Sequence, residues 1–263
     1  MTRYRGIFDS HAHYDDAAFD ADRDAVLSSF LPAHGVAGVV DCGADLASSE
    51  AAAALAARYP HVCAAAGIHP EGVKDLPDDW EDALRSLLAK PKIVAVGEIG
   101  LDYHFKENAP RERQQEVFER QVRLANELGL PIVVHDREAH ADTLRILQKL
   151  RPAGVVHCFS GSVEMARQIL GLGMYIGLGG AVTFQNARVP VEVAAMVPDD
   201  RLVLETDCPY MAPVPFRGKR NDSSLIAYTA ERIAAVRKTD AQALIDLARR
   251  NTERLFRIFE SEA

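Results

Sequence analysis

Two histidines, His11 and His13, stand two positions apart where the first short apolar run of the sequence ends, in GIFDSHAHYD at 6–15. Alternate residues of a β-strand face the same side, so both imidazoles can reach one cation. Further residues of metal-binding type end later apolar runs: Glu98, His135, His157 and Asp207. Neutral imidazole suits zinc, manganese and iron, whereas carboxylates suit magnesium and manganese, so the set predicts two divalent cations.

Each of these residues taken alone also has an ordinary structural explanation. An HxH pair at a strand end can be a solvated turn, and a single histidine in an apolar segment is more often a hydrogen-bonded core residue than a ligand. Asp207, which precedes Cys208-Pro209, can cap a turn, and Glu98 can pair with a core arginine. The combined pattern favours a metal site, because unrelated residues would not all fall at the same end of different strands.

Glu98 belongs to the fourth strand-like run, which places it centrally among the candidate ligands. A carboxylate can put one oxygen on each of two cations. Two cations roughly 3.5–4 Å apart activate a water molecule and stabilise the leaving oxygen of a phosphoryl group. We therefore expect Glu98 to bridge the two ions.

The elements that carry these residues alternate between short apolar runs and amphipathic stretches. Eight strand-like runs are recognised, at residues 6–11, 38–43, 62–69, 93–100, 131–136, 153–159, 174–180 and 201–207. Helical spacing of apolar residues is seen at residues 22–35, 48–60, 80–90, 110–129, 138–150, 163–173, 224–238 and 240–259. Gly129 is a helix stop that leads directly into the fifth strand.

Strand runs that are nearly all apolar are typical of a parallel sheet covered on both faces. Eight βα units predict an α/β fold, a single-domain (β/α)8 TIM barrel with C-terminal helices, over residues 1–263. A doubly wound open sheet would show GxGxxG after its first strand, and SHAHYD at 10–15 is no such loop. In a barrel the active site lies at the C-terminal ends of the strands, where the candidate ligands fall.

Composition restricts the class of protein further. The chain has 30 Lys+Arg and 38 Asp+Glu, a formal net charge of -8, which disfavours a protein that coats nucleic acid electrostatically. No apolar stretch approaches the roughly 18 residues of a spanning helix, so we expect a cytoplasmic protein with no membrane partner. The cysteines are expected to be small buried residues: Cys42, Cys63, Cys158 and Cys208. The oligomeric state stays open, and a monomer is compatible with the sequence.

At these motifs the sequence resembles the TatD family of metal-dependent hydrolases. The matching segments span nearly the whole chain: DSHAH at 9–13, GIHP at 67–70, VGEIGLDY at 96–103, QQEVFERQ at 114–121, LPIVVHDRE at 130–138, HCFSGS at 157–162 and ETDCPY at 205–210. The resemblance implies a TIM barrel, a divalent metal pair and a Mg-dependent DNase activity, often a 3′ to 5′ exonuclease. Its substrate would be DNA ends or short nucleic acid.

The resemblance also implies how the two ions, Mg, Mn or Zn, would be shared among the ligands. One ion would be held by His11, His13, Glu98 and Asp207, and the other by Glu98, His135 and His157. Related amidohydrolases often have a carboxylated lysine in the place of Glu98, so the glutamate favours the TatD branch. Glu98 and Asp207 would be the catalytic residues, because Asp207 would orient the attacking water and accept its proton.

Two further carboxylates lie near the predicted ligands. Glu205, two residues before Asp207, would face the same way and support a ligand or a further ion, and a pairing with a nearby arginine is the alternative. Asp9, two residues before His11, is the expected hydrogen-bonding partner behind the first ligand.

Substrate contacts are predicted from the third strand and from the basic loop at 215–221 (PFRGKRN), which follows the eighth strand. Arginine matches phosphate oxygens bidentately, and Phe216 offers a stacking face to a base. A solvated surface turn is the alternative for this loop. The predicted substrate-binding residues are His69, Arg217, Arg220 and Asn221.

Predictions are also made for three other positions. Tyr103 and His104 follow the fourth strand and either meet a base or sugar or have no catalytic part, and Arg137 is expected to form a salt bridge. The family usually has Pro two positions after the Arg-Asn pair, whereas this chain has Asp222 and then Ser223 after Asn221. The change removes a fixed φ and adds negative charge beside the predicted phosphate site.

Two other classes of function stay open. The same metals would serve a hydrolase of a small phosphoester, an amide, a lactone or aminoacyl-tRNA, and the acidic net charge is compatible with such substrates. The third class is a non-enzymatic metal-binding or interaction protein that keeps the barrel as a scaffold. The presence of all six predicted ligands argues against that third class.

Overall fold

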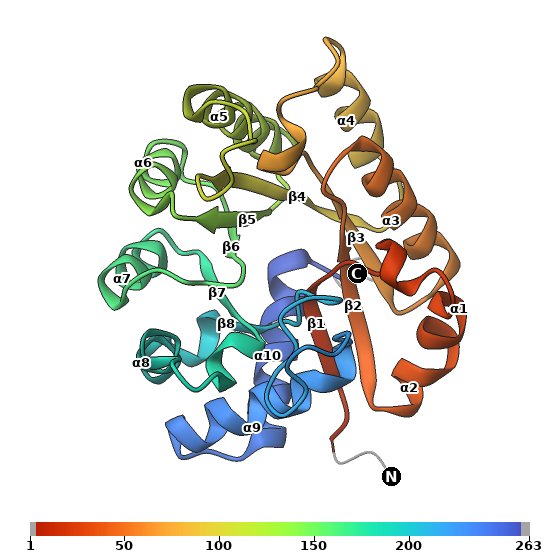
Figure 1. Ribbon diagram of the computed structural model, residues 1–263, viewed down its shortest axis with the longest axis vertical. Helices are drawn as coiled ribbons and strands as arrows, with labels where there is room; N and C mark the ends of the chain where they lie inside the picture. The colour runs from red at the N-terminus through yellow and green to blue at the C-terminus, as the bar shows by residue number, and fades with distance from the viewer. Residues whose placement is uncertain (1–3, 259–263) are drawn as a thin grey trace.

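The computed structural model describes residues 4–258. Its eight strands form one parallel sheet in chain order: β1 (Ile7–Ala12), β2 (Val36–Cys42), β3 (Val62–Ala66), β4 (Ile93–Asp102), β5 (Ile132–Arg137), β6 (Gly154–Val156), β7 (Tyr175–Leu178) and β8 (Leu202–Leu204). The helices are α1 (Arg23–Ala25), α2 (Leu31–Ala33), α3 (Leu46–Arg58), α4 (Trp80–Leu88), α5 (Arg111–Leu128), α6 (His140–Leu150), α7 (Val163–Gly171), α8 (Arg188–Met196), α9 (Ile226–Arg237) and α10 (Ala241–Phe256). Figure 1 shows α3 to α8 around the outside of the ring of strands, whereas Leu255 and Phe256 of α10 pack with the inner strand residues. The predicted TIM barrel with C-terminal helices is confirmed.

The predicted elements differ from the observed ones in several places, among them the ends of β3 at Ala66, β6 at Val156 and β8 at Leu204, which come earlier than predicted. The sequence patterns named no helix where α8 lies, and the stretch 22–35 is divided into α1, a π-helical turn at Val26–Phe30, and α2. The last helix ends at Phe256, before the end of its predicted range, and residue 259 lies outside the described residues. That the domain extends over 1–263 stays a prediction.

The strand ends close the ring and bring the first and last candidate ligands together. Beyond β8 the chain pairs with the end of β1: the Asp207 N–H donates to the His11 carbonyl at 3.0 Å, and the His13 N–H donates to the Cys208 carbonyl at 2.8 Å. Asp207 has a left-handed φ of 58°, which turns the chain into this pairing. The backbone itself therefore fixes Asp207 beside the HxH pair.

The nearly all-apolar strands are explained by burial on both faces. Alternate strand residues such as Phe8, Val40 and Val133 pack together in the inner cluster, whereas Ile7 and Val39 pack outward against the helices. Helix signals also behave as expected, because Gly129 ends α5 in a left-handed conformation with φ 67°.

Two further expectations concern burial and membranes. All four cysteines are free, and three of them are buried, whereas Cys158 is partly exposed. Between residues 4 and 258, none of the helices combines the length and the apolar composition needed to cross a bilayer.

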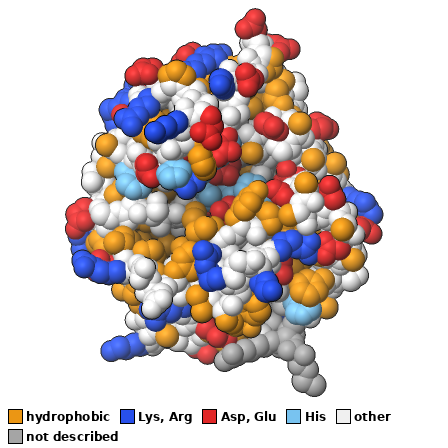
Figure 2. Space-filling model, in the orientation of Figure 1, with side chains coloured by type: hydrophobic (Ala, Val, Ile, Leu, Met, Phe, Trp, Pro, Cys, Tyr) orange, Lys and Arg blue, Asp and Glu red, His pale blue; other side chains and the backbone are white. Residues whose placement is uncertain are grey.

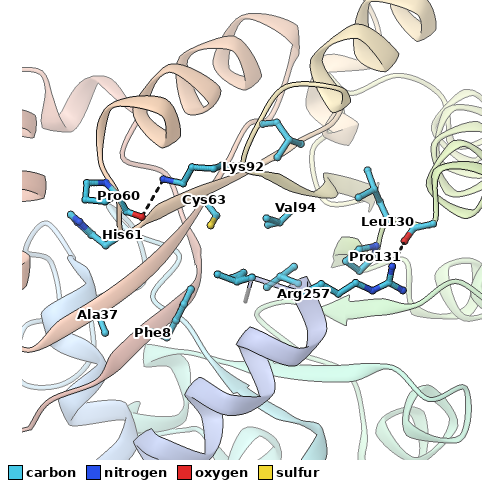
Figure 3. Close-up of a pocket in the computed structure, with 14 residues that line it drawn as sticks. Phe8, Ala37, Pro60, His61, Cys63, Lys92, Val94, Leu130, Pro131 and Arg257 are labelled. Atoms are coloured by element: carbon cyan, nitrogen blue, oxygen red, sulfur yellow. Dashed lines mark hydrogen bonds between the residues drawn. The ribbon is translucent and has the colours of Figure 1, made fainter. Parts of the chain in front are cut away.

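A hollow of about 630 Å³ lies at the N-terminal ends of the strands, away from the candidate ligands (Figure 3). Phe8, Cys63 and Phe256 contribute to its lining, and Lys92 donates to the Pro60 carbonyl at 3.2 Å. None of the predicted ligands is among the residues that line it. The candidate site is therefore located by its chemistry at the other end of the barrel.

Candidate metal centre

All six predicted ligands meet at the C-terminal end of the barrel. His11 is in β1, Glu98 in β4 and His135 in β5, whereas His157 and Asp207 follow the ends of β6 and β8. Figure 2 shows histidine side chains at the floor of a hollow, with acidic side chains along one wall and hydrophobic ones along the other. In the described part of the chain, three groups have ligand atoms within 4.8 Å of one another: His11, His157 and Asp207; His11, His13 and Glu98; His69, Glu98 and His135.

Glu98 is the centre of this arrangement. One carboxylate oxygen, Oε2, lies 3.3 Å from His11 Nε2 and 3.5 Å from His13 Nε2. The other, Oε1, lies 2.7 Å from His157 Nε2 and 2.8 Å from His135 Nδ1. The two oxygens therefore face two separate pairs of imidazole nitrogens.

The local backbone is what turns Glu98 toward the barrel axis. The pairing of β4 with β5 shifts register between Val96 and Ile99, so Glu98 leaves the outward side that strict alternation from Val96 would give it. Gly100, at φ 151°, allows the close approach of β5, because a Cβ there would lie 1.9 Å from the His135 carbonyl oxygen.

The first pair of imidazoles has its tautomer partly fixed by the backbone. His13 Nδ1 lies 2.7 Å from the Cys42 carbonyl oxygen, so Nδ1 carries a proton and Nε2 is the nitrogen available to a cation. His11 Nε2 lies 3.0 Å from His13 Nε2, and Asp207 Oδ1 lies 3.6 and 3.4 Å from these two nitrogens. Three ligand atoms from β1 and the end of β8 thus converge on one point.

The second pair of imidazoles, His135 and His157, is supported by a residue that the sequence analysis did not predict. Asp102, buried at the end of β4, accepts from His135 Nε2 at 3.1 Å. A carboxylate on the far side of a ligand histidine orients its ring and raises its basicity. The signal in the sequence was the spacing of four residues from Glu98, which puts Asp102 on the same face of the strand.

The two predicted catalytic carboxylates are kept ionised by the surrounding imidazoles. Burial would raise the pKa of Glu98, but His157 and His11 hold it well below its usual range. Burial would likewise raise the pKa of Asp207, but His13 and His157 keep it below the ordinary value. Both groups are therefore in the anionic form that binds a cation.

Two histidines carry the balancing positive charge. Burial would lower the pKa of His13, but Asp207 and Glu98 raise it to about 10. Burial would also lower the pKa of His135, but Asp102 and Glu98 raise it to about 10. Since a ligand imidazole must be neutral, bound cations would take over the charge that these protons supply.

The donor set fits a pair of divalent cations, because His11 Nε2, His13 Nε2, His135 Nδ1 and His157 Nε2 all face the two oxygens of Glu98. The buried ring nitrogens His11 Nδ1 and His157 Nδ1 and the buried Glu205 Oε2 have no hydrogen-bond partner. In both rings the nitrogen that faces Glu98 is Nε2, so the unpaired Nδ1 atoms lie on the side away from the proposed cations.

Glu205 and Asp9 both lie behind the candidate ligands. Glu205 is buried, accepts from the Cys158 N–H, and places Oε1 3.9 Å from His157 Nδ1. Asp9 accepts from the His11 N–H at 3.2 Å and from the Thr206 N–H at 3.0 Å. Asp9 therefore links the strand that carries His11 to the chain just before Asp207.

His69 lies beside the centre, with Nε2 3.6 Å from Glu98 Oε1. Its Nδ1 accepts from the Glu71 N–H at 3.3 Å, so Nε2 carries the proton and acts as a donor. Burial, followed by the charge of His135, lowers the pKa of His69 to about 3. A neutral imidazole with Nε2–H directed into the site suits contact with a substrate oxygen better than metal binding.

The basic loop has other contacts than those predicted from the sequence. Arg220 forms a bidentate ion pair with Asp22, at 2.7 Å for both contacts, and Arg217 lies over the Phe184 ring at 3.8 Å. Phe216 makes an edge contact with another aromatic ring, that of Tyr228 in α9. These three side chains therefore contact other residues of the protein, and none of the three candidate metal-binding groups includes them.

Asn221 is fully buried and holds the loop in place. Its amide donates to the Thr206 carbonyl at 3.0 Å and to the Tyr210 carbonyl at 2.7 Å. Both amide hydrogens are therefore used to anchor the chain that follows Asp207, and the observed role of this side chain is structural.

Tyr103, His104 and Arg137 all contact neighbouring side chains. The Tyr103 hydroxyl donates to Asp142 at 3.0 Å, and Arg111 lies over its ring at 4.3 Å. His104 pairs with Glu138 at 2.7 Å. Arg137 lies over the Phe105 ring at 4.8 Å, a cation–π contact where a salt bridge was expected.

Ser223, which stands where the family usually has Pro, compensates for that change with hydrogen bonds. Its N–H donates to the Tyr14 hydroxyl at 2.9 Å, and its Oγ donates to Asp9 Oδ2 at 2.7 Å. Proline has no N–H and no hydroxyl, so neither bond would form with it. In this chain the network under the HxH pair depends on the serine and on Tyr14.

We expect Tyr14→Phe to lower the free energy of unfolding by about 1–3 kcal/mol, because it leaves the buried Ser223 N–H without an acceptor. Urea denaturation with an unchanged m value would measure this loss. Tyr210→Phe removes the same hydroxyl from an exposed ring and is expected to stay within about 0.5 kcal/mol of the parent. Equal stability of both variants would contradict the importance of this bond.

Barrels that gather imidazole and carboxylate ligands at this end of their strands include the metal-dependent hydrolases, and comparison with known proteins places the chain in that class. The family model described as TatD related DNase matches residues 8–257. The chain therefore belongs to the TatD family of metal-dependent hydrolases, as its motifs indicated.

Individual relatives agree with this family over their full length. The chain is 39% identical over 255 residues to "Uncharacterized metal-dependent hydrolase YabD" of Bacillus subtilis strain 168, covering 96% of this chain and 99% of that protein. It is 34% identical over 261 residues to "3'-5' ssDNA/RNA exonuclease TatD" of Citrobacter rodentium, covering 96% and 98%. The crystal structure of YJJV, a TatD homologue from Escherichia coli K12, superposes with a TM-score of 0.89 at 32% identity, covering 96% and 98%.

Proposed function

We propose that this hydrolase is a phosphodiesterase that uses two divalent cations, Mg, Mn or Zn, to release nucleotides from DNA ends or short nucleic acid, as a 3′ to 5′ exonuclease. The observation that carries the proposal is the position of Glu98, whose two oxygens face different pairs of imidazoles. One carboxylate shared between two ligand sets can hold two cations close enough together for two-metal hydrolysis.

The proposed ligand sets follow the geometry of the centre. His11, His13 and Asp207 lie on the Oε2 side of Glu98, and His135 and His157 lie on the Oε1 side. Bound there, two cations would lower the pKa of water and stabilise charge on the phosphoryl oxygens. The buried imidazoles exclude bulk solvent on the barrel side, which strengthens these electrostatic effects.

The side chains of this protein would then position and deprotonate the reactants. Asp207 is anionic, less buried than Glu98, and 19% exposed, so its carboxylate can take a proton from the attacking water. His69 Nε2–H would donate to a substrate oxygen on the Oε1 side of Glu98. Tyr103, His104 and Arg137 are engaged with neighbouring side chains and have no assigned part.

The nucleic-acid substrate is supported by two facts outside the metal ligands. A relative that is 34% identical carries the name "3'-5' ssDNA/RNA exonuclease TatD". Arg217 and Lys219 are exposed on the loop after β8, although the chain as a whole is acidic. The free cysteines fit a reducing compartment, and we propose that the protein acts in the cytoplasm.

A second candidate is a hydrolase of a small phosphoester, a lactone or an aminoacyl-tRNA ester. The observation that favours it is the engagement of Arg220 by Asp22 and of Asn221 by backbone carbonyls, which leaves fewer groups for a long phosphate backbone. A small substrate would need only the cations and the near residues.

One preparation tested on three substrates separates the candidates. We expect the metal-loaded protein to release nucleotides from a single-stranded oligonucleotide and, more slowly, to cleave a chromogenic phosphodiester, but to leave a lactone unchanged. Turnover of the lactone without release of nucleotides would reject the nuclease proposal. A metal-loaded sample that is inactive on all three would instead favour the non-enzymatic alternative.

Metal loading should also stabilise the protein. With Mn²⁺ at a free concentration of about 100 Kd, the chelator-treated protein should gain about 2.7 kcal/mol for each ion bound, which corresponds to roughly 5–10 °C in Tm per ion. His135→Ala should reduce the shift, whereas His34→Ala, which removes an exposed histidine of the α2 end, should preserve it. Calorimetric scans with Mg²⁺, Mn²⁺ and Zn²⁺ would measure it, and a Tm unmoved by all three ions would contradict the ligand assignment.

A further inference from the structure

Tyr210 has the highest exposure of any large apolar side chain between residues 4 and 258, at 55%. It lies on the loop after β8, three residues beyond Asp207. The centroid of its ring is 6.4 Å from that of His13, with an interplanar angle of 61°. An exposed aromatic ring therefore borders the candidate metal centre.

Single exposed apolar residues are common on protein surfaces, but this one is anchored at both ends. Its hydroxyl donates to Asp16 Oδ2 at 2.8 Å, and its N–H donates to the Asp207 carbonyl at 2.9 Å. Its own carbonyl accepts from the buried Asn221 amide at 2.7 Å. The ring is thus held in place before any ligand arrives, which reduces the entropy lost on binding.

The other aromatic rings near the mouth already have a partner. Arg111 lies over Tyr103 at 4.3 Å, Arg217 lies over Phe184 at 3.8 Å, and Phe216 contacts the ring of Tyr228 at 5.0 Å between centroids. Phe216 was the stacking residue expected from the sequence. The exposure and position of Tyr210 make it the better candidate for that role.

The charge beside Tyr210 indicates which part of a nucleotide would lie on it. The Asp16 carboxylate bonds the hydroxyl end of the ring and would repel the phosphodiester backbone. A nucleobase is uncharged and presents a flat face, and aromatic rings stack on every base without sequence preference.

We propose that Tyr210 is a substrate-binding residue whose ring stacks on the base of a nucleotide adjoining the scissile phosphate. The inference rests on the proposed nuclease function, and it agrees with the single-stranded substrate in the name of the 34% identical relative, because a base inside a duplex is already paired and stacked. Loss of one base stack reduces affinity roughly 5- to 150-fold.

Kinetics on a short single-stranded oligonucleotide test this role, with Tyr210→Ala, Tyr210→Phe and the control Val214→Ala, which trims another exposed residue of the same loop. Tyr210→Ala should raise KM roughly 5- to 150-fold with a smaller change in kcat. Tyr210→Phe keeps the ring but loses the hydrogen bond to Asp16 that holds it, so its KM should lie between those of the parent and Tyr210→Ala, whereas Val214→Ala should stay near the parent.

An abasic residue placed at each position of the oligonucleotide in turn locates the stack. At one position next to the cleaved bond, the parent and Tyr210→Ala should become equal, because the base that the ring holds is gone. A difference that persists at every abasic position, or a Tyr210→Ala variant equal to the parent on the normal strand, overturns the inference while the nuclease function stands. A parent protein that releases no nucleotides overturns both.

Discussion

Replacing Glu98 by glutamine is expected to lower nucleotide release by about 10³-fold, because two-metal stabilisation is worth several kcal/mol and about 1.4 kcal/mol corresponds to a factor of ten. Glutamine keeps the size of the side chain but not the second anionic oxygen. With one oxygen, it cannot serve both the His11–His13 pair and the His135–His157 pair. The effect should appear in the binding of both ions.

Isothermal titration with Mn²⁺ measures this directly. We expect the affinity of Glu98→Gln for each ion to fall by at least the roughly 10–100-fold that follows loss of an outer partner of a ligand. Glu71→Gln makes the same chemical change at an exposed carboxylate beside His69 and serves as the control. If Glu98→Gln binds two ions as tightly as the parent, the shared carboxylate is not the bridge.

The barrel and the clustering of the candidate ligands were predictable from the sequence for a simple reason. Buried parallel strands are apolar on both faces, so a histidine or carboxylate at the end of such a run is conspicuous. His11, Glu98 and Asp207 are such residues, and the structure brings them together. The chain pairing beyond β8 sets Asp207 against His11, which strand order alone implies once the barrel is closed.

Features that depend on backbone irregularity or tertiary contacts were not predictable in the same way. Strict alternation along β4 would have placed Glu98 with the outward Val96, and only the register shift corrects this. α8, with the sequence RVPVEVAAM, contains a proline and three β-branched valines, which hide its helical spacing. Local sequence therefore predicts which residues cluster better than it predicts the backbone geometry that directs their side chains.

The basic loop shows the same limit for substrate residues. Residue type predicted phosphate contacts for Arg220 and Asn221. In the structure both side chains instead bond to protein groups that the local sequence does not indicate. Asp22 lies 198 positions from Arg220, and Asn221 reaches the Thr206 and Tyr210 carbonyls. The role proposed for Tyr210, in contrast, rests on the exposure of its ring and on the hydrogen bonds of its hydroxyl and backbone, which the sequence does not show.

Replacing Asp207 by asparagine is expected to lower nucleotide release by roughly 10²–10⁴-fold, because the amide cannot accept a proton from the attacking water. The protein should stay folded, since the pairing of this residue with His11 uses its backbone N–H. Circular dichroism and the release of nucleotides in Mg²⁺ or Mn²⁺ measure the two properties. Asp200→Asn, at an exposed carboxylate of the 3₁₀ turn before β8, is the control.

The metal concentration distinguishes the two parts assigned to Asp207. Its Oδ1 lies close to His11 and His13, so the variant should also bind one ion more weakly. If excess Mn²⁺ restores full release, Asp207 is a ligand and the proton goes elsewhere. Inactivity at saturating metal, with both ions bound, assigns the proton to this carboxylate, whereas undiminished release at ordinary metal concentrations would exclude it from both parts.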